Sequence, residues 1–243
     1  MVPCYNEARR LPVEQFREFL KTADVDLVFV NDGSGDRTVE VLETLRAARP
    51  ERVTVLDDKV NRGKAEAVRR GISFALDRGC GFVGFWDADL ATPLSDIPQF
   101  LAVLEQEPEL DMVFGSRVKL LGRHVERKAA RHYLGRIFAT FVSTMLRLPI
   151  YDTQCGAKIF RVTRHAPALF GQPFLSRWIF DVEIIARYLQ QVGTAAAAKR
   201  IYEFPLLRWV DVAGSKLKPK DFFVSFWDVL RIRGAYLGTK GTK

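Results

Sequence analysis

Two aspartates, Asp87 and Asp89, follow directly on an apolar run, Phe82–Trp86. On an extended backbone, side chains two residues apart point to the same side, so these carboxylates can act together. Two hard oxygen ligands of this kind can hold Mg²⁺ or Mn²⁺ and leave coordination positions for diphosphate oxygens and water. The pair could instead cap the helix that is expected to begin near Pro93, but its place at the end of a buried strand favours a metal site.

A second polar cluster, Asn31–Asp36, follows another apolar run, Val25–Val30. Its glycines permit left-handed turn geometry and Asp36 can cap a helix, which is a purely structural explanation. The cluster is not a dinucleotide fingerprint, because Thr38 stands where the third glycine of G-x-G-x-x-G is required. A carboxylate such as Asp32 can accept hydrogen bonds from a base N–H or a ribose hydroxyl, so the cluster predicts a nucleotide pocket.

The first two-thirds of the chain alternates strand-like and helix-like segments. The strand-like segments are 25–30, 53–56, 81–86 and 112–114, and the helix-like segments are 39–45, 63–76 and one that begins at Pro93. This alternation predicts an α/β fold built of right-handed βαβ units, with a mostly parallel mixed sheet and helices on both faces. In such sheets ligands bind outside the carboxyl ends of the strands, where Asn31–Gly33, Asp87–Asp89 and Gly115–Arg117 are expected to gather.

The N-terminal segment Met1–Glu7 has the character of a strand end that runs into a loop, yet almost no strand precedes it. A sheet with a shortened first strand would leave neighbouring strands unpaired and apolar surface exposed. We therefore expect the first strand to be truncated, or the start to be misassigned.

Taken in order, the polar segments resemble the motifs of family 2 glycosyltransferases, which have the GT-A nucleotide-sugar-binding fold. The matching segments are Pro3–Glu7, Val30–Ser34, Asn61–Lys64, Asp87–Asp89 and Gly115–Arg117. Three later segments, Asp152–Lys158, Trp178–Glu183 and Trp209–Leu217, resemble the branch that makes dolichyl- or polyprenyl-phosphate sugars, above all its β-glucosyl members. The resemblance covers residues 1–217, the expected GT-A domain, and a basic amphipathic C-terminal helical segment is expected at 218–243.

The resemblance implies a role for each matching residue. For the nucleotide-sugar, these residues are Pro3, Tyr5, Glu7, Asp32, Lys64, Asp87 and Ala88. Asp32 is assigned to the base, Lys64 to the base or the diphosphate, and Asp87 and Asp89 to the metal. The acceptor phosphate is assigned to Arg117, Arg131 and Lys216, and catalysis to Asp87, Asp89, Arg117 and Asp152. Asp152 is expected to orient the acceptor loop or a sugar hydroxyl.

The reaction that the resemblance implies is an inverting transfer of a hexose onto dolichyl or polyprenyl phosphate, dependent on Mg²⁺ or Mn²⁺. Mannosyl members carry a glutamine two residues after the second aspartate as a further metal ligand, whereas this chain has Ala91. We therefore favour UDP-glucose over GDP-mannose as the donor. We also expect the metal to have fewer protein ligands, or to have its coordination completed by water. An acceptor phosphate monoester has a second pKa near ~6 and is already anionic at neutral pH, so no strong general base is required.

Lys and Arg number 37 against 29 Asp and Glu, and this net charge of +8 suits an anionic partner such as a phosphorylated ligand or an acidic membrane surface. No stretch approaches the ~20 apolar residues that a transmembrane helix needs. Two amphipathic stripes flanked by basic residues instead predict contact with a membrane surface, although such stripes more often pack on a sheet. They are Leu134, Phe138, Phe141, Met145 and Leu148, and Phe222, Phe223, Phe226, Trp227 and Leu230. Three widely spaced cysteines favour a reducing compartment, so we expect a cytoplasmic protein bound peripherally to the cytoplasmic face of a membrane.

Three other functions are compatible with parts of the sequence. A dolichyl-phosphate mannosyltransferase would use GDP-mannose at the same site. A soluble family 2 transferase that glycosylates a sugar hydroxyl would need a carboxylate general base, which Asp181 or Glu183 could supply. A basic nucleic-acid-binding module would use the +8 charge, but Asp87 and Asp89 would repel phosphate without a metal, so we expect no nucleic-acid partner.

Overall fold

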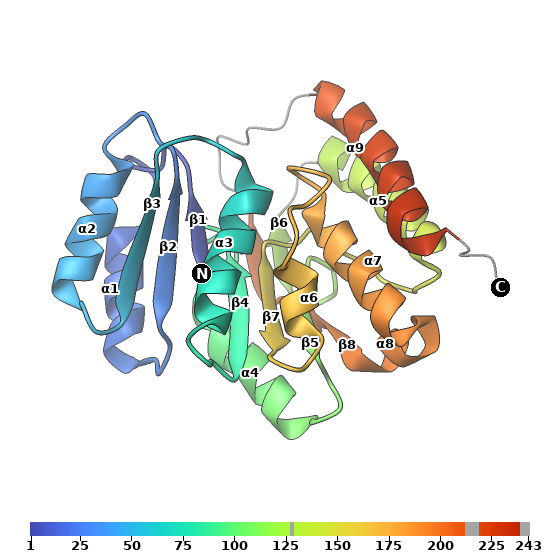
Figure 1. Cartoon of the computed structure of the whole chain (residues 1–243), viewed down its shortest axis with the longest axis horizontal. Coiled ribbons are helices and arrows are strands. Elements are labelled where there is room, and N and C mark those ends of the chain that lie inside the picture. The colour runs from blue at the N-terminus through green and yellow to red at the C-terminus, as the bar shows by residue number, and fades with distance from the viewer. Residues whose placement is uncertain (127–128, 212–218, 239–243) are drawn as a thin grey trace.

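The computed structural model describes residues 1–126, 129–211 and 219–238. Its N-terminal part alternates strands and helices: β1 (Val2–Cys4), α1 (Val13–Thr22), β2 (Leu27–Asp32), α2 (Thr38–Ala48) and β3 (Val53–Asp58). The three strands are parallel and lie in the order β1-β2-β3 (Figure 1).

Strand β2 is buried on both of its faces, which explains its nearly continuous apolar sequence. Leu27 and Phe29 pack in one hydrophobic cluster with residues of α1 and α2. Val28 and Val30 pack in another cluster with Ala67, which belongs to α3 (Lys64–Leu76). The prediction of a sheet with helices on both faces is therefore confirmed for this part of the molecule.

The other large sheet is mixed. Strands β4 (Phe82–Trp86), β5 (Met112–Ser116), β7 (Ala157–Arg161) and β8 (Ile201–Pro205) lie in the order β4-β7-β5-β8. Strand β7 is antiparallel to both of its neighbours, whereas β5 and β8 are parallel to each other. Helices of this half include α4 (Asp96–Gln106), α6 (Ala166–Phe170), α7 (Phe180–Val192) and α8 (Thr194–Arg200). Two short parallel strands, β6 (His124–Glu126) and β9 (Arg208–Val210), pair separately.

Backbone hydrogen bonds of Met1 join the two sheets along β1 and β4. The Met1 amine donates to the carbonyl oxygen of Gly84 at 2.7 Å, and Trp86 donates its N–H to the Met1 carbonyl oxygen at 3.0 Å. In a parallel pair of strands, one residue bonds through its N–H and its C=O to two residues of the neighbouring strand that are two positions apart, as Met1 does with Gly84 and Trp86. The three residues of β1 thus lie between β2 and β4, in the middle of the combined strand order.

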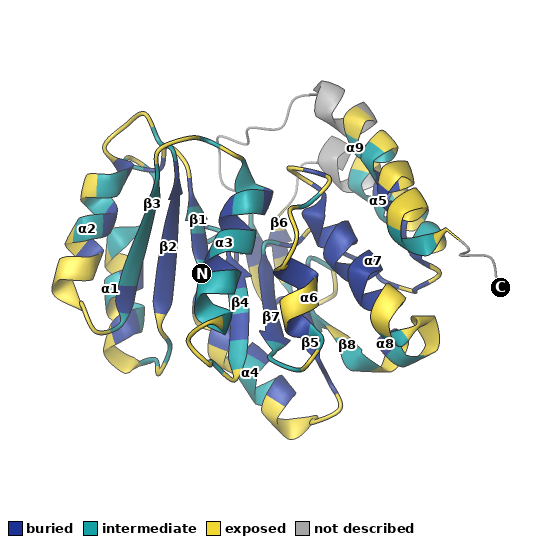
Figure 2. Cartoon of the chain, viewed as in Figure 1, coloured by how far each residue is buried: buried dark blue, intermediate teal, exposed yellow. Residues whose placement is uncertain are grey.

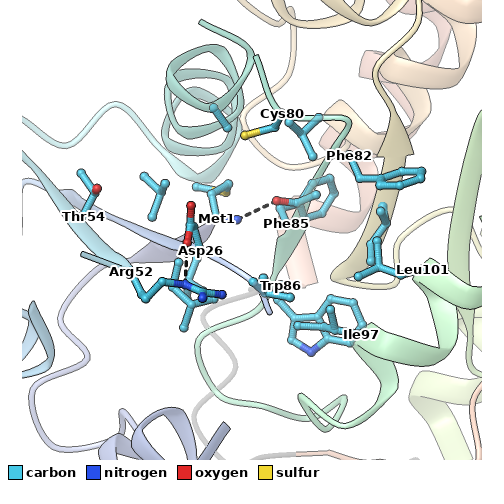
Figure 3. A pocket seen from close by; sticks show the side chains of 18 of the residues that line it. Met1, Asp26, Arg52, Thr54, Cys80, Phe82, Phe85, Trp86, Ile97 and Leu101 are labelled. Atoms are coloured by element: carbon cyan, nitrogen blue, oxygen red, sulfur yellow. Dashed lines mark hydrogen bonds and ion pairs between the residues drawn. The ribbon is translucent and has the colours of Figure 1, made fainter. Parts of the chain in front are cut away.

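A cavity of about 330 Å³ opens beside Met1, between β2 and β4 (Figure 3). Apolar side chains that include Val83 and Phe85 line it, and Arg52 pairs with Asp26 at 2.7 Å on its wall. Burial lowers the pKa of the Met1 amine to about 5. None of the residues predicted to carry chemistry lines this cavity.

Helices α5 (Ala129–Leu146) and α9 (Pro219–Ile232) lie side by side at one end of the molecule, next to α7 (Figure 1). Phe226 of α9 packs against Phe138 and Phe141 of α5, with ring centroids 5.4 and 5.0 Å apart. The prediction that these aromatic side chains face a membrane is therefore wrong for Phe138 and Phe226, because their rings pack against each other. A π-helix, η1 (Arg233–Leu237), continues α9.

Other apolar side chains of these two helices remain exposed. They are Leu134 and Ile137 on α5, and Val224, Trp227 and Leu230 on α9. Trp227 has an exposed fraction of 66%, and Figure 2 shows the exposed face of α9. Among the described residues, no helix is both long enough and apolar enough to cross a membrane. The side chains of Phe222 and Phe223 lie outside the described part, as does the predicted boundary between residues 217 and 218.

Candidate active site

A cleft of about 480 Å³ lies at the carboxyl ends of β1, β2 and β4. All of the residues predicted for the nucleotide-sugar line it, namely Pro3, Tyr5, Glu7, Asp32, Lys64, Asp87 and Ala88. Asp89 lines it too. The fold thus brings together residues from distant parts of the chain at the edge of the sheet where ligands bind. Their individual binding roles stay predictions.

Asp32 is buried at the end of β2 and fixes the loop that precedes α3. Its Oδ1 accepts the backbone N–H of Arg62 at 2.7 Å, and its Oδ2 accepts that of Gly63 at 2.8 Å. The Asn61 side chain donates to the Asp32 carbonyl oxygen at 3.1 Å. A carboxylate oxygen has more than one acceptor position, so the predicted contact between Asp32 and a base is compatible with these bonds.

Lys64 and Asp87 form an ion pair inside the cleft, with Nζ and Oδ1 2.5 Å apart. Burial alone would lower the pKa of Lys64, but the carboxylates of Asp87, Asp181 and Asp89 raise it above its ordinary value. The neighbouring carboxylates therefore favour the charged form of Lys64, at the first residue of α3. The N-terminus of a helix also favours anions, so this corner of the cleft suits a diphosphate.

Asp89 lies close to the negative charge of Asp87. Burial and the neighbouring Asp87 charge raise the pKa of the Asp89 carboxyl above its ordinary value. Two carboxylates that repel each other in a partly buried site would be stabilised by a divalent cation, and their oxygens are the ligands that Mg²⁺ and Mn²⁺ prefer. Among the described residues, no cluster of three or more His, Cys, Asp or Glu side chains could hold a metal. The donor set therefore fits a metal only if substrate oxygens and water complete the coordination.

The loop before β7 lies behind the cleft and contacts Asp87. Asp87 donates its backbone N–H to the Gly156 carbonyl oxygen at 2.9 Å, and the Asp87 carboxylate lies where a side chain on residue 156 would be. Deeper in the protein, the fully buried Lys158 donates to Asp181 Oδ1 at 2.6 Å and to the Cys155 carbonyl oxygen at 2.5 Å. This buried ion pair connects β7 with the start of α7.

Arg117 and Asp152 form a second, partly buried ion pair, outside the lining of the cleft. The Arg117 Nε and Nη2 donate to the two Asp152 carboxylate oxygens at 2.6 and 2.8 Å, which is the bidentate geometry of a strong pair. The Asp152 loop is held in turn by Glu203, which accepts the backbone N–H groups of Tyr151 and Asp152 at 2.8 and 2.7 Å. Arg117 also lies over the Trp209 ring, 5.3 Å from its centroid.

The structure describes little of the other residues that were predicted to bind the acceptor phosphate. Arg131 lies on α5, but its side chain is outside the described part of the chain, and Lys216 is outside it altogether. Arg136, one turn further along α5, donates to the Tyr151 carbonyl oxygen at 3.2 Å and lies over the Tyr151 ring. This arginine therefore supports the loop that carries Asp152.

The two carboxylates considered as a general base are not available for that role. Asp181 is paired with Lys158. Glu183 is fully buried and accepts hydrogen bonds from Arg187, Tyr236 and the backbone N–H of Leu175. The surroundings of these two carboxylates therefore give no support to the alternative of a soluble transferase that uses either one as its base. Burial also raises the pKa of the Cys155 thiol to about 11, which agrees with its interpretation as a packed residue rather than a nucleophile.

Among the residues to which sequence reasoning assigned no role, Arg10, Arg177 and Trp178 also line the cleft. Arg10 follows the N-terminal motif and acts electrostatically on Asp89. Trp178 is the first residue of the segment Trp178–Glu183, which resembles the lipid-phosphate branch, so the sequence did indicate a functional role for it. Arg177 gave none, because only the fold brings it next to Asn61.

The family model of glycosyl transferase family 2 matches residues 1–166. The dolichyl-phosphate β-glucosyltransferase of Dictyostelium discoideum is 33% identical over 98% of this chain and 74% of that protein. The mouse enzyme of the same name (Mus musculus) is 34% identical over 98% of this chain and 75% of its own length. The structure of glucosyl-3-phosphoglycerate synthase from Mycobacterium tuberculosis with Mn²⁺ and UDP-glucose superposes with a TM-score of 0.68 at 16% identity, covering 96% of this chain and 77% of that one. This likeness confirms the predicted GT-A fold.

Proposed function

The chain belongs to glycosyl transferase family 2, and on that premise we propose that it transfers glucose from UDP-glucose to dolichyl or polyprenyl phosphate. The observation that carries the proposal is the single cleft in which all residues assigned to the nucleotide-sugar meet. Its volume of about 480 Å³ is in the range of small-molecule sites. The names of the relatives support the same sugar and the same class of acceptor.

In the proposed donor complex, Tyr5, Glu7 and Asp32 surround the nucleoside, and the Lys64 ammonium meets the diphosphate. The ion pair between Lys64 and Asp87 supports this arrangement, because it holds the ammonium inside the cleft. Mg²⁺ or Mn²⁺ bound by Asp87 and Asp89 would neutralise negative charge on the departing diphosphate. Lys64 acts on the same charge from the protein side, which is electrostatic stabilisation of the leaving group.

The acceptor phosphate is proposed to bind at Arg117. A guanidinium has five N–H donors, and Asp152 orients it through Nε and Nη2. An oxygen of the acceptor phosphate then attacks the anomeric carbon, and the bond from that carbon to the UDP oxygen breaks. Direct attack inverts the α-linked donor to a β-linked product. Because the phosphate is already anionic, orientation by Arg117 takes the place of proton removal by a general base.

We also propose that the exposed apolar side chains of α5 and α9 rest on the cytoplasmic face of a membrane. Ile137 and Trp227 are 60% and 66% exposed on helices that otherwise pack into the core. A polyprenyl or dolichyl phosphate stays in the bilayer, so the enzyme has to meet it there. Lys and Arg near the surface add about 1 kcal/mol each to binding of anionic lipid.

Isothermal titration calorimetry tests the donor and metal parts of this proposal. With Mn²⁺ present, UDP should bind more tightly than GDP, and EDTA should weaken UDP binding. Asp89→Ala should remove the effect of Mn²⁺ without unfolding the protein, because Asp89 lines an open cleft. Tighter binding of GDP would favour a mannosyl donor instead. UDP binding that is the same in Mn²⁺ and in EDTA would contradict the metal assignment.

A further inference from the structure

The loop between α6 and α7 forms one wall of the cleft, although its sequence carries no nucleotide motif. Arg177 and Trp178 of this loop line the cleft together with Asp32, Asn61 and Gly63. Ser176 fixes the loop, because its Oγ accepts the backbone N–H groups of Trp178 and Ile179 at 3.2 and 3.1 Å. The position of Arg177 is therefore set by the start of α7.

Arg177 lies directly against the loop that Asp32 holds. Its Nη2 donates to the Asn61 Oδ1 at 2.8 Å, and its carbonyl oxygen accepts the N–H of Ala65. Gly63 has a φ of +97°, and a Cβ on this residue would lie 2.6 Å from the Arg177 Nε. The side chain of Arg177 thus occupies the space that the missing side chain of Gly63 leaves.

We propose that Arg177 closes the nucleoside end of the cleft and selects a pyrimidine over a purine nucleotide by size. The inference rests on the proposed function, in which Asp32 meets the base. In the proposed complex a base beside Asp32 extends towards Asn61 and Gly63, and the solvent-exposed side chain of Arg177 lies against both of these residues. A uracil ring ends before this wall, whereas the second ring of guanine extends into it. Excluding the larger ligand by steric conflict is a direct way to obtain specificity.

Calorimetry with UDP and with GDP, in the presence of Mn²⁺, tests the inference on wild-type protein and on three variants. Arg177→Ala removes the side chain that is proposed to close the nucleoside end of the cleft. Arg177→Met keeps most of its bulk without the guanidinium. Arg46→Ala is a control that removes the same charge from an exposed ion pair on α2, with Glu43 at 2.7 Å. Circular dichroism checks that each variant is folded, and Arg177→Ser replaces Arg177→Ala if the alanine variant is not.

In Arg177→Ala, GDP should bind more tightly than in the wild type, and the preference for UDP should fall by about tenfold, a typical value for discrimination by pocket size. Arg177→Met and Arg46→Ala should keep the wild-type preference. An unchanged preference in Arg177→Ala would overturn the inference, and so would an equal loss in Arg177→Met, since charge rather than size would then decide. The wild-type titrations test the proposed function separately: protein that does not prefer UDP refutes the UDP-glucose assignment and this inference with it.

Discussion

Asp87 and Gly156, from the end of β4 and the loop before β7, are in direct contact. Asp87 donates its backbone N–H to the Gly156 carbonyl oxygen at 2.9 Å. The Asp87 carboxylate also fills the space next to the Gly156 Cα, where any other residue would place its Cβ. The position of the proposed metal ligand thus depends on the absence of a side chain on a distant segment.

Gly156→Ala should therefore displace the Asp87 carboxylate and lower turnover by about a hundredfold, the loss expected when a catalytic group moves by about 1 Å. Turnover with UDP-glucose and a short prenyl phosphate measures the effect. Gly81→Ala is the matched control, because nothing lies within 4 Å of the Cβ it would gain. Equal turnover in both variants would show that Asp87 does not need its observed position.

The ionisation of Asp89 gives a prediction in the metal-free protein. Burial and the Asp87 charge raise the pKa of Asp89, so the carboxylate forms only at a pH above the ordinary carboxyl value of about 3.9. Affinity for a metal should be present above this raised pKa and should be lost as the pH falls through it. An NMR titration of ¹³C-labelled aspartate side chains measures the pKa directly. Asp87→Asn and added Mg²⁺ should each shift the Asp89 titration to lower pH, and a titration that neither one moves would refute the coupling.

Glu183 and Arg187 provide a test against the soluble transferase. Glu183 accepts hydrogen bonds from Arg187 at 2.8 Å and from Tyr236 at 2.8 Å, in a fully buried position. Glu183→Gln should lower the free energy of unfolding by about 3–5 kcal/mol, because it leaves the buried Arg187 charge without its anionic partner. Turnover at a temperature where the variant is folded should change little.

Chemical denaturation and initial rates separate the two roles of Glu183. The control is Glu43→Gln, which breaks an exposed helical pair with Arg46 and should cost less than about 1 kcal/mol. A folded Glu183→Gln variant that has lost all turnover would instead identify Glu183 as a catalytic base.

The surface of α9 gives a prediction about membrane contact. Trp227→Asp with Leu230→Asp should abolish sedimentation with vesicles that contain anionic lipid, because each large side chain contributes roughly 1.5–3 kcal/mol when fully removed from water. Both residues are exposed, so the thermal unfolding temperature should change little. Phe226→Ala should behave in the opposite way. It removes a ring packed between Phe138 and Phe141, and should destabilise the protein by about 3 kcal/mol. Unchanged sedimentation of the double variant would exclude α9 as the lipid contact.

The sequence predicted the elements that carry the donor cleft, because their signals are local. Continuous apolar runs gave β2 and β4, and the polar residues at their ends gave Asp32 and Asp87. The antiparallel placement of β7 was not predicted. Its five residues carry no signal for the strand they pair with, since pairing depends on segments far away in the chain.

The same limit explains the errors. An apolar stripe on a helix looks alike whether it packs on a neighbour or on lipid, so Phe226 and Trp227 received the same interpretation although only Trp227 is exposed. Arg177 could not be found, because its contact with Asn61 joins segments that no motif connects. Glu183 was a candidate base because of its residue type alone. The sequence did not reveal that its carboxylate is buried and paired with Arg187.

Transfer of the sugar itself is the most direct test of the central claim. Purified protein with Mn²⁺ would be incubated with UDP-glucose, UDP-galactose or GDP-mannose, and with dolichyl or undecaprenyl phosphate in detergent, and the lipid products would be read by mass spectrometry. Asp89→Ala serves as the inactive control, with a loss of at least about a hundredfold as for other groups that stabilise charge in the transition state. We expect a hexosyl phosphate lipid from UDP-glucose, with a β linkage by NMR. A lipid product from GDP-mannose but not from UDP-glucose, or no lipid product from any of the three donors, would contradict this assignment.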